Sequence, residues 1–420
     1  MSTPNPLTTL PTGQALAPIA IARQAILDEG RNVFGYELFD RSVVSNEHTA
    51  SSDAQLLFNV LSLSDSEALP GKKTIFINCT HDSLAGGHLD LVAPDRVVLE
   101  IPPLPISKAD QIPDYLPSLQ EIQRRGFRMA FNYSILTRSY ESWLPLASFI
   151  KFDLSILKPD AVGSFIKLAQ AKSQARLIAE KVETLKQYEL VAGLGIKLFQ
   201  GYWFAQPVMV EGQTIRPAQA TILQLINLVR KQASTNEIEE VLKRDPTLSF
   251  NLLRFINSAG FGMRTEVTSF KHAVMLLGLN RLFKWAALLM TTSRSGDTPP
   301  AVGTTAVIRG RLMELLATEI LSVDDCDNAF VVGIFSLLDT MLGIPMEQAL
   351  ATVMLPASVT DALLHKTGPL APFLELTIAC ETGDDVAFAN AANTLGLNSN
   401  QINWAHLQAL AWAETLTQVD

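Results

Sequence analysis

The sequence predicts two domains of different fold class, an α/β barrel followed by an all-α domain. Its 420 residues exceed what one ordinary hydrophobic core accommodates. From residue 19 to about 207, short runs of β-branched and aromatic residues alternate with amphipathic helical segments. From about residue 216 onward the strand signals vanish and amphipathic helices follow one another. We expect a disordered, proline-containing tail over 1–18, a barrel domain over 19–210 and a helical domain over 217–410.

About eight strand-like runs in the first domain fit a compact βα barrel. Strands are expected at 19–23, 33–41, 73–78, 96–101, 128–132, 149–153, 176–180 and 196–199. Helices are expected at 53–63, within 107–125, at 160–171 and at 184–192. Because strands that alternate with helices usually pair in parallel, we expect a largely parallel sheet.

The second domain is predicted to consist of helices alone. A capping-box pattern, Ser234 with Glu237, opens one of them. The other helices are expected at 217–231, 247–258, 269–277, 280–291, 302–321, 327–341, 357–366, 370–380, 384–393 and 399–416.

Charge, cysteine spacing and the length of apolar runs exclude several classes of partner and location. The net charge is −9 and the basic residues are scattered, so nucleic acid is not expected as a partner. Cys79, Cys326 and Cys380 are far apart and form no CxxC pair, which argues against a disulfide framework and fits a reducing cytoplasm. No uninterrupted apolar run approaches the roughly 18 residues of a membrane span. We expect a cytoplasmic protein with no membrane partner.

Glu37 lies in the middle of the apolar, β-forming run 33–41. A carboxylate on such a strand is costly unless it is paired, hydrogen-bonded or bound to a metal. The alternative is a glutamate that points to solvent at a strand end, and this stretch alone leaves both interpretations open.

Polar residues recur at the ends of the other predicted strands, and they strengthen the site interpretation. They are Asn78, Glu100, Asn132, Lys151, Asp153 and Glu180. In a βα barrel one end of every strand faces the site, so side chains from different strands converge there. Carboxylate and amide oxygens suit Mg²⁺, Mn²⁺ or Ca²⁺, and a lysine beside them can orient a phosphate or a water.

These residues resemble the motifs of EAL domains, which are cyclic-di-GMP phosphodiesterases with a modified TIM barrel. The matching segments, in family order, are Gln24-Ala25-Ile26, Gly35-Tyr36-Glu37-Leu38, Arg41, Ile77-Asn78, Leu99-Glu100-Ile101, Lys151-Phe152-Asp153, Ala179-Glu180-Lys181-Val182-Glu183-Thr184 and Gln200-Gly201-Tyr202. The resemblance spans about residues 19–207.

The resemblance implies a role for each matched position. Glu37, Asn78 and Glu100 match metal ligands, and Glu180 matches a further metal-site carboxylate. Lys151 matches the lysine that orients the attacking water. Glu183 matches a glutamate that supports the active-site loop, and Gln200 matches a glutamine near the water and metals. The expected ligand-binding residues are Gln24, Glu37, Arg41 and Asp153, with Arg41 at a phosphate.

The departures from the family pattern concern the metal site. The paired aspartates of the family fall on Asn132 and Tyr133, a further glutamate falls on Pro103, and the namesake tripeptide ends in Phe39. A two-metal mechanism needs a bridging carboxylate, which neither a neutral amide nor a phenol replaces. Each lost charge a few Å from a cation costs on the order of several kcal/mol. We expect one weakly bound Mg²⁺ or Mn²⁺ at most, no required cofactor and no useful hydrolysis.

The helical half resembles an HDOD domain. The resemblance rests on the segments 237–249, 252–259 and 269–279, and weakens toward residue 400. HDOD domains resemble HD phosphohydrolases without the metal ligands. Where such an enzyme has adjacent His and Asp, this chain has Ser336 and Leu337.

Three functions are compatible with this pattern. The one we favour is a non-catalytic signalling or scaffold protein with signalling protein partners. The alternatives are a weak phosphodiesterase with a one-metal site and an inactive receptor that still binds cyclic-di-GMP. The EAL resemblance also implies a possible homodimer through the barrel.

Overall fold

The barrel closes in sequence order, from the first strand to the eighth. The computed structural model describes residues 20–41, 73–85, 89, 94–205, 217–243, 246–257, 270–292, 299–382 and 384–417. The predicted tail over 1–18 and the predicted helix over 53–63 lie outside these described residues. The strands are β1 Ala20–Leu27, β2 Val33–Arg41, β3 Thr74–Asn78, β4 Val97–Ile101, β5 Arg128–Asn132, β6 Ala147–Asp153, β7 Arg176–Glu180 and β8 Leu198–Gln200. An eight-stranded barrel was predicted, and it is confirmed.

Strand β1 departs from the parallel arrangement, because it runs antiparallel to both of its neighbours, β2 and β8. All other neighbouring strands are parallel. Only residues 28–32 join β1 to β2, and Asp28 accepts a hydrogen bond from the Asn32 backbone N–H across this turn. A connection this short permits only antiparallel pairing, since a parallel pair needs a crossover of a dozen or more residues.

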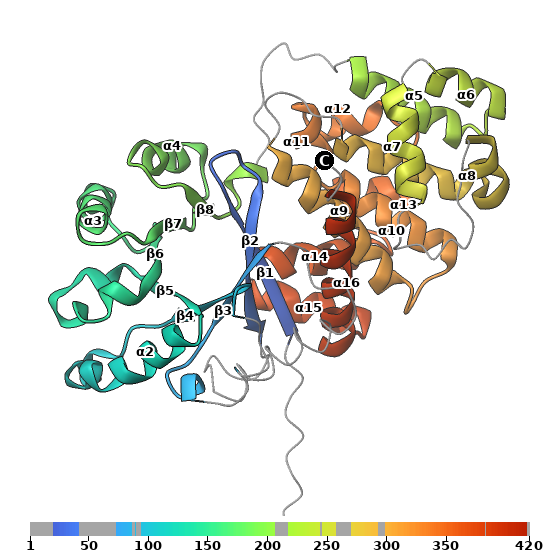
Figure 1. Cartoon of the computed structure of the whole chain (residues 1–420). Helices are drawn as coiled ribbons and strands as arrows, with labels where there is room; N and C mark the ends of the chain where they lie inside the picture. The colour runs from blue at the N-terminus through green and yellow to red at the C-terminus, as the bar shows by residue number, and fades with distance from the viewer. Residues whose placement is uncertain are drawn as a thin grey trace, which may run out of the picture.

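Helices cover the outside of the barrel away from β1 (Figure 1). They are a 3₁₀ segment, Ile106–Tyr115, followed by α2 Leu116–Arg124, then α3 Pro159–Lys172 and α4 Leu185–Gly193. Helix α4 begins with a capping box in which Thr184 and Gln187 satisfy each other's backbone donors. These helices agree with the predicted ones to within a few residues.

The barrel interior has two layers, which follow from the two-residue period of a strand. The lower layer is apolar and is formed by Ile26, Phe76, Val98, Ala130, Phe149, Ile178 and Leu198. Two positions farther along β3 to β8 come polar residues: Asn78, Glu100, Asn132, Lys151, Glu180 and Gln200. The apolar layer therefore closes the floor of the barrel directly beneath the polar side chains.

The second half of the chain is helical. Its helices are α5 Pro217–Arg230, α6 Thr235–Lys243, α7 Pro246–Ile256, α8 Phe270–Leu288, α9 Pro300–Ala317, α10 Val323–Phe335, α11 Leu338–Leu342, α12 Met346–Ala351, α13 Ala357–Thr360, α14 Ala371–Thr382, α15 Asp385–Leu395 and α16 Ser399–Thr417. Gly278, with φ of 73°, interrupts α8 where two separate helices were predicted. The single helix predicted over 327–341 is wrong, because Leu337 (φ −123°, ψ 20°) separates α10 from α11. Helix α12 was not predicted.

The helical region packs against the β1–β2 side of the barrel. Helices α14 and α16 contact β1, and α9 contacts β2 (Figure 1). One continuous cluster of buried apolar side chains extends from the outer side of the barrel into the helical region. Within the described part of the chain, no helix is long and apolar enough to cross a membrane.

Candidate functional site

The candidate site is a buried ionic cluster centred on Lys151 of β6. Its Nζ lies 2.7 Å from a carboxylate oxygen of each of three glutamates: Glu37 of β2, Glu100 of β4 and Glu180 of β7. The side chains of Lys151 and Glu37 are almost completely buried, whereas that of Glu180 is 20% exposed. Four strands thus deliver one cation and three acidic groups to the same end of the barrel.

Amide side chains complete the cluster around Glu37. Asn78 Nδ2 donates to Glu37 Oε1 at 3.1 Å, and Gln200 Nε2 donates to Glu37 Oε2 at 2.6 Å. Gln200 Nε2 also donates to Gln24 Oε1 at 2.8 Å. Gln200 Oε1 is buried and has no hydrogen-bond partner among the described residues. This oxygen is therefore an acceptor available to a bound ligand, ion or water.

Burial and mutual charge set the protonation of the cluster. Burial raises the pKa of Glu100 to about 8; the charge of Glu37 adds to this effect and Lys151 opposes it. Burial likewise raises the pKa of Glu180. For Lys151, burial favours the neutral amine, but the glutamates outweigh it and hold the pKa well above its usual value. Lys151 therefore stays protonated at neutral pH, and Glu100 holds a proton more readily than an ordinary glutamate does.

The donor set fits one hard divalent cation. Oxygens of Glu37, Glu100 and Glu180 lie within 4.8 Å of one another. Carboxylate and amide oxygens are the ligands that Mg²⁺ and Mn²⁺ prefer. The same oxygens already surround Lys151 Nζ, so a cation held there competes with the ammonium group.

Asn132 and Tyr133, which the EAL resemblance matches to paired aspartates, are engaged elsewhere. Asn132 Oδ1 accepts hydrogen bonds from the backbone N–H of Ser134 at 3.0 Å and from its hydroxyl, and so caps the turn that follows β5. The ring of Tyr133 packs edge-on against Phe165 of α3, with 5.4 Å between centroids. Neither position contributes a carboxylate to the cluster.

Asp153 lies beside the Lys151 cluster, because it pairs with Glu180 across β6 and β7 and its charge adds to the rise in the pKa of that glutamate. Asp153 Oδ1 accepts from the backbone N–H and hydroxyl of Ser155, which fixes the end of β6. Glu183 is exposed, and its backbone N–H donates to Gln187. Arg41 is the last residue of β2, and its side chain lies outside the described part of the structure.

A second buried polar cluster, which the sequence did not reveal, joins the barrel to the helical region. We call it the interdomain cluster, and its members are Arg23 of β1, Tyr202 after β8, Arg309 of α9, Ser336 after α10, Glu381 of α14 and His406 of α16. Arg309 contacts Glu381 (Nη2–Oε2 2.7 Å), Ser336 Oγ (3.0 Å from Nη1) and the Tyr202 hydroxyl. Arg23 contacts Glu381 at 3.3 Å, and its Nε donates to His406 Nε2.

Electrostatics keep Arg309 charged within the interdomain cluster. Burial opposes the charge of Arg309, but Glu381 and Tyr202 outweigh burial and raise its pKa. Burial raises the pKa of Tyr202, which stays a neutral phenol beside the guanidinium. The only sequence signals for this cluster were an arginine inside an apolar strand and the Gln200-Gly201-Tyr202 motif.

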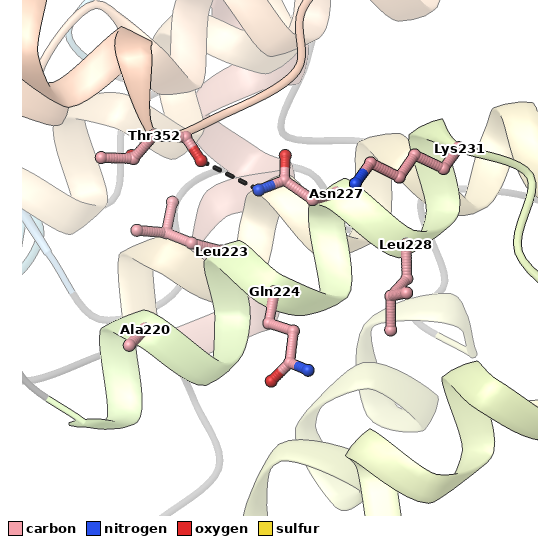
Figure 2. Close-up of a pocket in the computed structure, with 7 residues that line it drawn as sticks. All are labelled: Ala220, Leu223, Gln224, Asn227, Leu228, Lys231 and Thr352. Carbon is pink, nitrogen blue, oxygen red and sulfur yellow. Dashed lines mark hydrogen bonds between the residues drawn. The ribbon is translucent and has the colours of Figure 1, made fainter.

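The helical region also has a surface groove of about 470 Å³, formed mainly by one face of α5 (Figure 2). It is lined by Ala220, Leu223, Gln224, Asn227, Leu228, Lys231 and Thr352. Asn227 Nδ2 donates to the Thr352 carbonyl oxygen at 2.9 Å, which ties α5 to the end of α12. The lining offers one charged group and no carboxylate, histidine or thiol, so it provides no catalytic chemistry.

The fold is an eight-stranded mixed barrel followed by a helical region, and part of the helical region matches a known domain family. Residues 215–353 match the HDOD domain family. The predicted boundaries, 19–210 and 217–410, stay predictions.

Two relatives match nearly the whole chain. The chain is 27% identical over 409 residues to Cyclic di-GMP phosphodiesterase CdgJ of Vibrio cholerae, covering 95% of this chain and 93% of that protein. It is 28% identical over 419 residues to the uncharacterized protein YuxH of Bacillus subtilis, covering 95% and 98%. Among solved structures, the calcium/cy-diGMP complex of Klebsiella pneumoniae BlrP1 matches with 20% identity, a TM-score of 0.36, and coverage of 46% of this chain and 57% of that one.

Proposed function

We propose that this chain is a non-catalytic protein of cyclic-di-GMP signalling, in which the barrel binds the dinucleotide and the helical region contacts protein partners. One observation carries the proposal: Asn132 and Tyr133, where the EAL resemblance expects paired aspartates, contribute no carboxylate to the cluster. The Lys151 ammonium group, 2.7 Å from each of the three glutamates, balances part of the charge of these groups. The identity to a relative named as a cyclic di-GMP phosphodiesterase supports the choice of ligand.

The absence of two acidic side chains supports the non-catalytic half of the proposal. Hydrolysis through two metals requires carboxylates that stabilise both the attacking and the leaving oxygen. Asn132 caps its own turn and Tyr133 packs on α3, so these positions supply no such groups. No cofactor is required for this function.

The proposed binding of the dinucleotide depends on polar side chains of the barrel. Gln24, Glu37, Arg41 and Asp153 are the proposed ligand-binding residues. Gln200 Oε1, buried without a partner among the described residues, is a further acceptor for a nucleotide amino group or water. The HDOD-like helices are the proposed surface for signalling partners, and a homodimer through the barrel is part of the same proposal.

Calorimetric titration with cyclic-di-GMP, with and without Mn²⁺, followed by chromatography of the products, tests this function. We expect binding, intact dinucleotide after prolonged incubation, and little dependence on Mn²⁺. Steady conversion to the linear dinucleotide, lost in Glu37→Ala, would replace the proposal with a catalytic one. Absence of binding at high micromolar ligand would remove the receptor role.

A weak phosphodiesterase with a single cation is the second candidate. It is favoured by three carboxyl groups whose oxygens lie within 4.8 Å. A cation held by Glu37, Glu100 and Glu180 would supply Lewis-acid stabilisation of a developing oxyanion. Hydrolysis by the parent protein that is lost in Glu37→Ala separates this candidate from the first. The double variant Asn132→Asp/Tyr133→Asp tests the premise that both share: if missing carboxylates limit the reaction, it hydrolyses the dinucleotide faster than the parent protein.

A further inference from the structure

Two strands connect the barrel site to the interdomain cluster. On β1, Gln24 contacts Gln200 in the site, and the preceding residue, Arg23, contacts Glu381 and His406 of the helical region. Successive side chains of a strand point to opposite faces, so one face of β1 contributes to the site and the other contacts the helical region. At the end of β8, Gln200 contacts Glu37, and Tyr202 reaches Arg309.

Glu381 is the shared acceptor of this cluster. Its carboxylate forms ion pairs with Arg23 of the barrel and with Arg309 of α9. The three side chains are 3%, 1% and 9% exposed for Arg23, Arg309 and Glu381 respectively. Buried cations without their carboxylate are strongly unfavourable, so these groups hold one another in a fixed geometry. Gly333 permits this geometry, because a Cβ there would lie 2.4 Å from the Gly310 backbone nitrogen and push α10 away from α9.

The backbone between Gln200 and Tyr202 has little freedom. Gly201 has φ of +148°, and a Cβ at this residue would lie 2.1 Å from the Val182 carbonyl oxygen. The Val182 backbone N–H donates to the Gln200 carbonyl oxygen at 3.0 Å, and Trp203 N–H donates to the Val182 carbonyl oxygen at 3.2 Å. A displacement of the Tyr202 hydroxyl is therefore transmitted to Gln200 instead of being absorbed between them.

We propose that Arg309 is a positioning residue of the barrel site. Through Tyr202 it fixes the orientation of the Gln200 carboxamide, and through Glu381 and Arg23 it fixes the strand segment that carries Gln24. The helical region thus holds Gln200 so that Nε2 donates to Glu37 and Oε1 remains available to a ligand. The ligand-binding part of this inference rests on the proposed function, whereas the positioning part concerns the protein alone.

The test uses Tyr202→Phe in the full-length protein, which removes the hydroxyl and keeps the ring. Tyr140→Phe is the matched control: Tyr140 is buried, and its hydroxyl accepts a hydrogen bond from the Leu104 backbone N–H at 2.8 Å inside the barrel half. The ligand-free readout is the side-chain amide signal of Gln200 in protein labelled with ¹⁵N-glutamine, assigned by comparison with Gln200→Met. We expect this signal to shift in Tyr202→Phe and Arg309→Lys, and to stay in place in Tyr140→Phe.

Calorimetry with cyclic-di-GMP is the second readout. We expect Tyr202→Phe to weaken dinucleotide binding by about fivefold, because only part of the free energy of one buried charge-assisted hydrogen bond affects the affinity of the site. Tyr140→Phe should leave the affinity within about twofold of that of the parent protein. An unshifted Gln200 signal in Tyr202→Phe, or an equal shift in both variants, overturns the positioning role. If the parent protein binds no dinucleotide, the proposed function fails, and the amide signal alone still decides whether Arg309 positions Gln200.

Discussion

The Lys151 cluster and the interdomain cluster are both buried and ionic, but their charge ratios are opposite. In the barrel, one lysine contacts three carboxyl groups, one of them 20% exposed. Between the halves, two arginines share one carboxylate that is 9% exposed. Acidic groups that reach solvent can exchange their cation for another, whereas two buried arginines depend on the carboxylate that both contact. We therefore expect cation exchange in the barrel cluster and cohesion of the two halves from the interdomain cluster.

Removal of Glu381 is expected to have the largest effect. Glu381→Ala leaves Arg23 and Arg309 buried without their carboxylate, which costs about 3–5 kcal/mol of stability. The measurement is the shift of the urea unfolding transition. Glu375→Ala, at an exposed position of the same helix, is the control and should change stability by less than about 0.5 kcal/mol. Equal shifts for both variants would contradict the cohesive role.

Removal of Lys151 probes the exchange of cations in the barrel. Lys151→Met should raise the affinity for Mn²⁺ by about tenfold or more, because a unit charge 4 Å away interacts with about 4 kcal/mol at an effective dielectric of 20. Free Mn²⁺ is measured by electron paramagnetic resonance during titration. The control is Lys158→Met, an exposed lysine that follows β6. If both variants bind Mn²⁺ as the parent does, the lysine does not compete with metal.

The barrel cluster also predicts a pH dependence of the free energy of unfolding. The pKa of Glu100 is raised to about 8 from the ordinary glutamate value of 4.5, so between these pH values the folded state keeps a proton that the unfolded state releases. The resulting stability is complete below pH 4.5 and is lost as pH rises through about 8. Glu100→Gln should flatten this decline by up to about 1 kcal/mol per pH unit.

The measurement for Glu100 is the unfolding free energy at a series of pH values between 5 and 8.5. Glu189→Gln, on the exposed side of α4, serves as the control and should leave the slope unchanged. Glu414, whose pKa burial raises to about 7, contributes a decline of the same sign in all variants. A slope that does not differ between Glu100→Gln and the parent would mean that Lys151 and its neighbours keep Glu100 ionised throughout.

The barrel cluster was predictable from the sequence because it repeats a local pattern. A polar residue follows an apolar one by two positions on β3, β4, β6, β7 and β8, and the two-residue period of a strand places them in stacked layers. The antiparallel pairing of β1 was also within reach, because residues 28–32 are too few for a crossover.

The interdomain cluster could not be predicted in the same way. Arg23 and Glu381 are 358 positions apart in the sequence, and Tyr202 and Arg309 are 107 apart. No periodicity marks such pairs, since each member belongs to a different element and their contact depends on how β1, α9 and α14 pack. Asn132 and Tyr133 are an intermediate case. The sequence shows that neither residue is a carboxylate, but it does not show that Asn132 accepts a hydrogen bond from Ser134 or that Tyr133 packs against Phe165.

Strand β1 belongs to both halves of the molecule at once. Its inner face carries Gln24 of the site, and its outer face is covered by α14 and α16 where other barrel strands have helices of their own half. A fragment that ends before the helical region would expose Arg23 and the apolar residues beside it. The barrel half is therefore expected to aggregate when produced alone, and sequence change along β1 is constrained by two interfaces on opposite sides of a single strand.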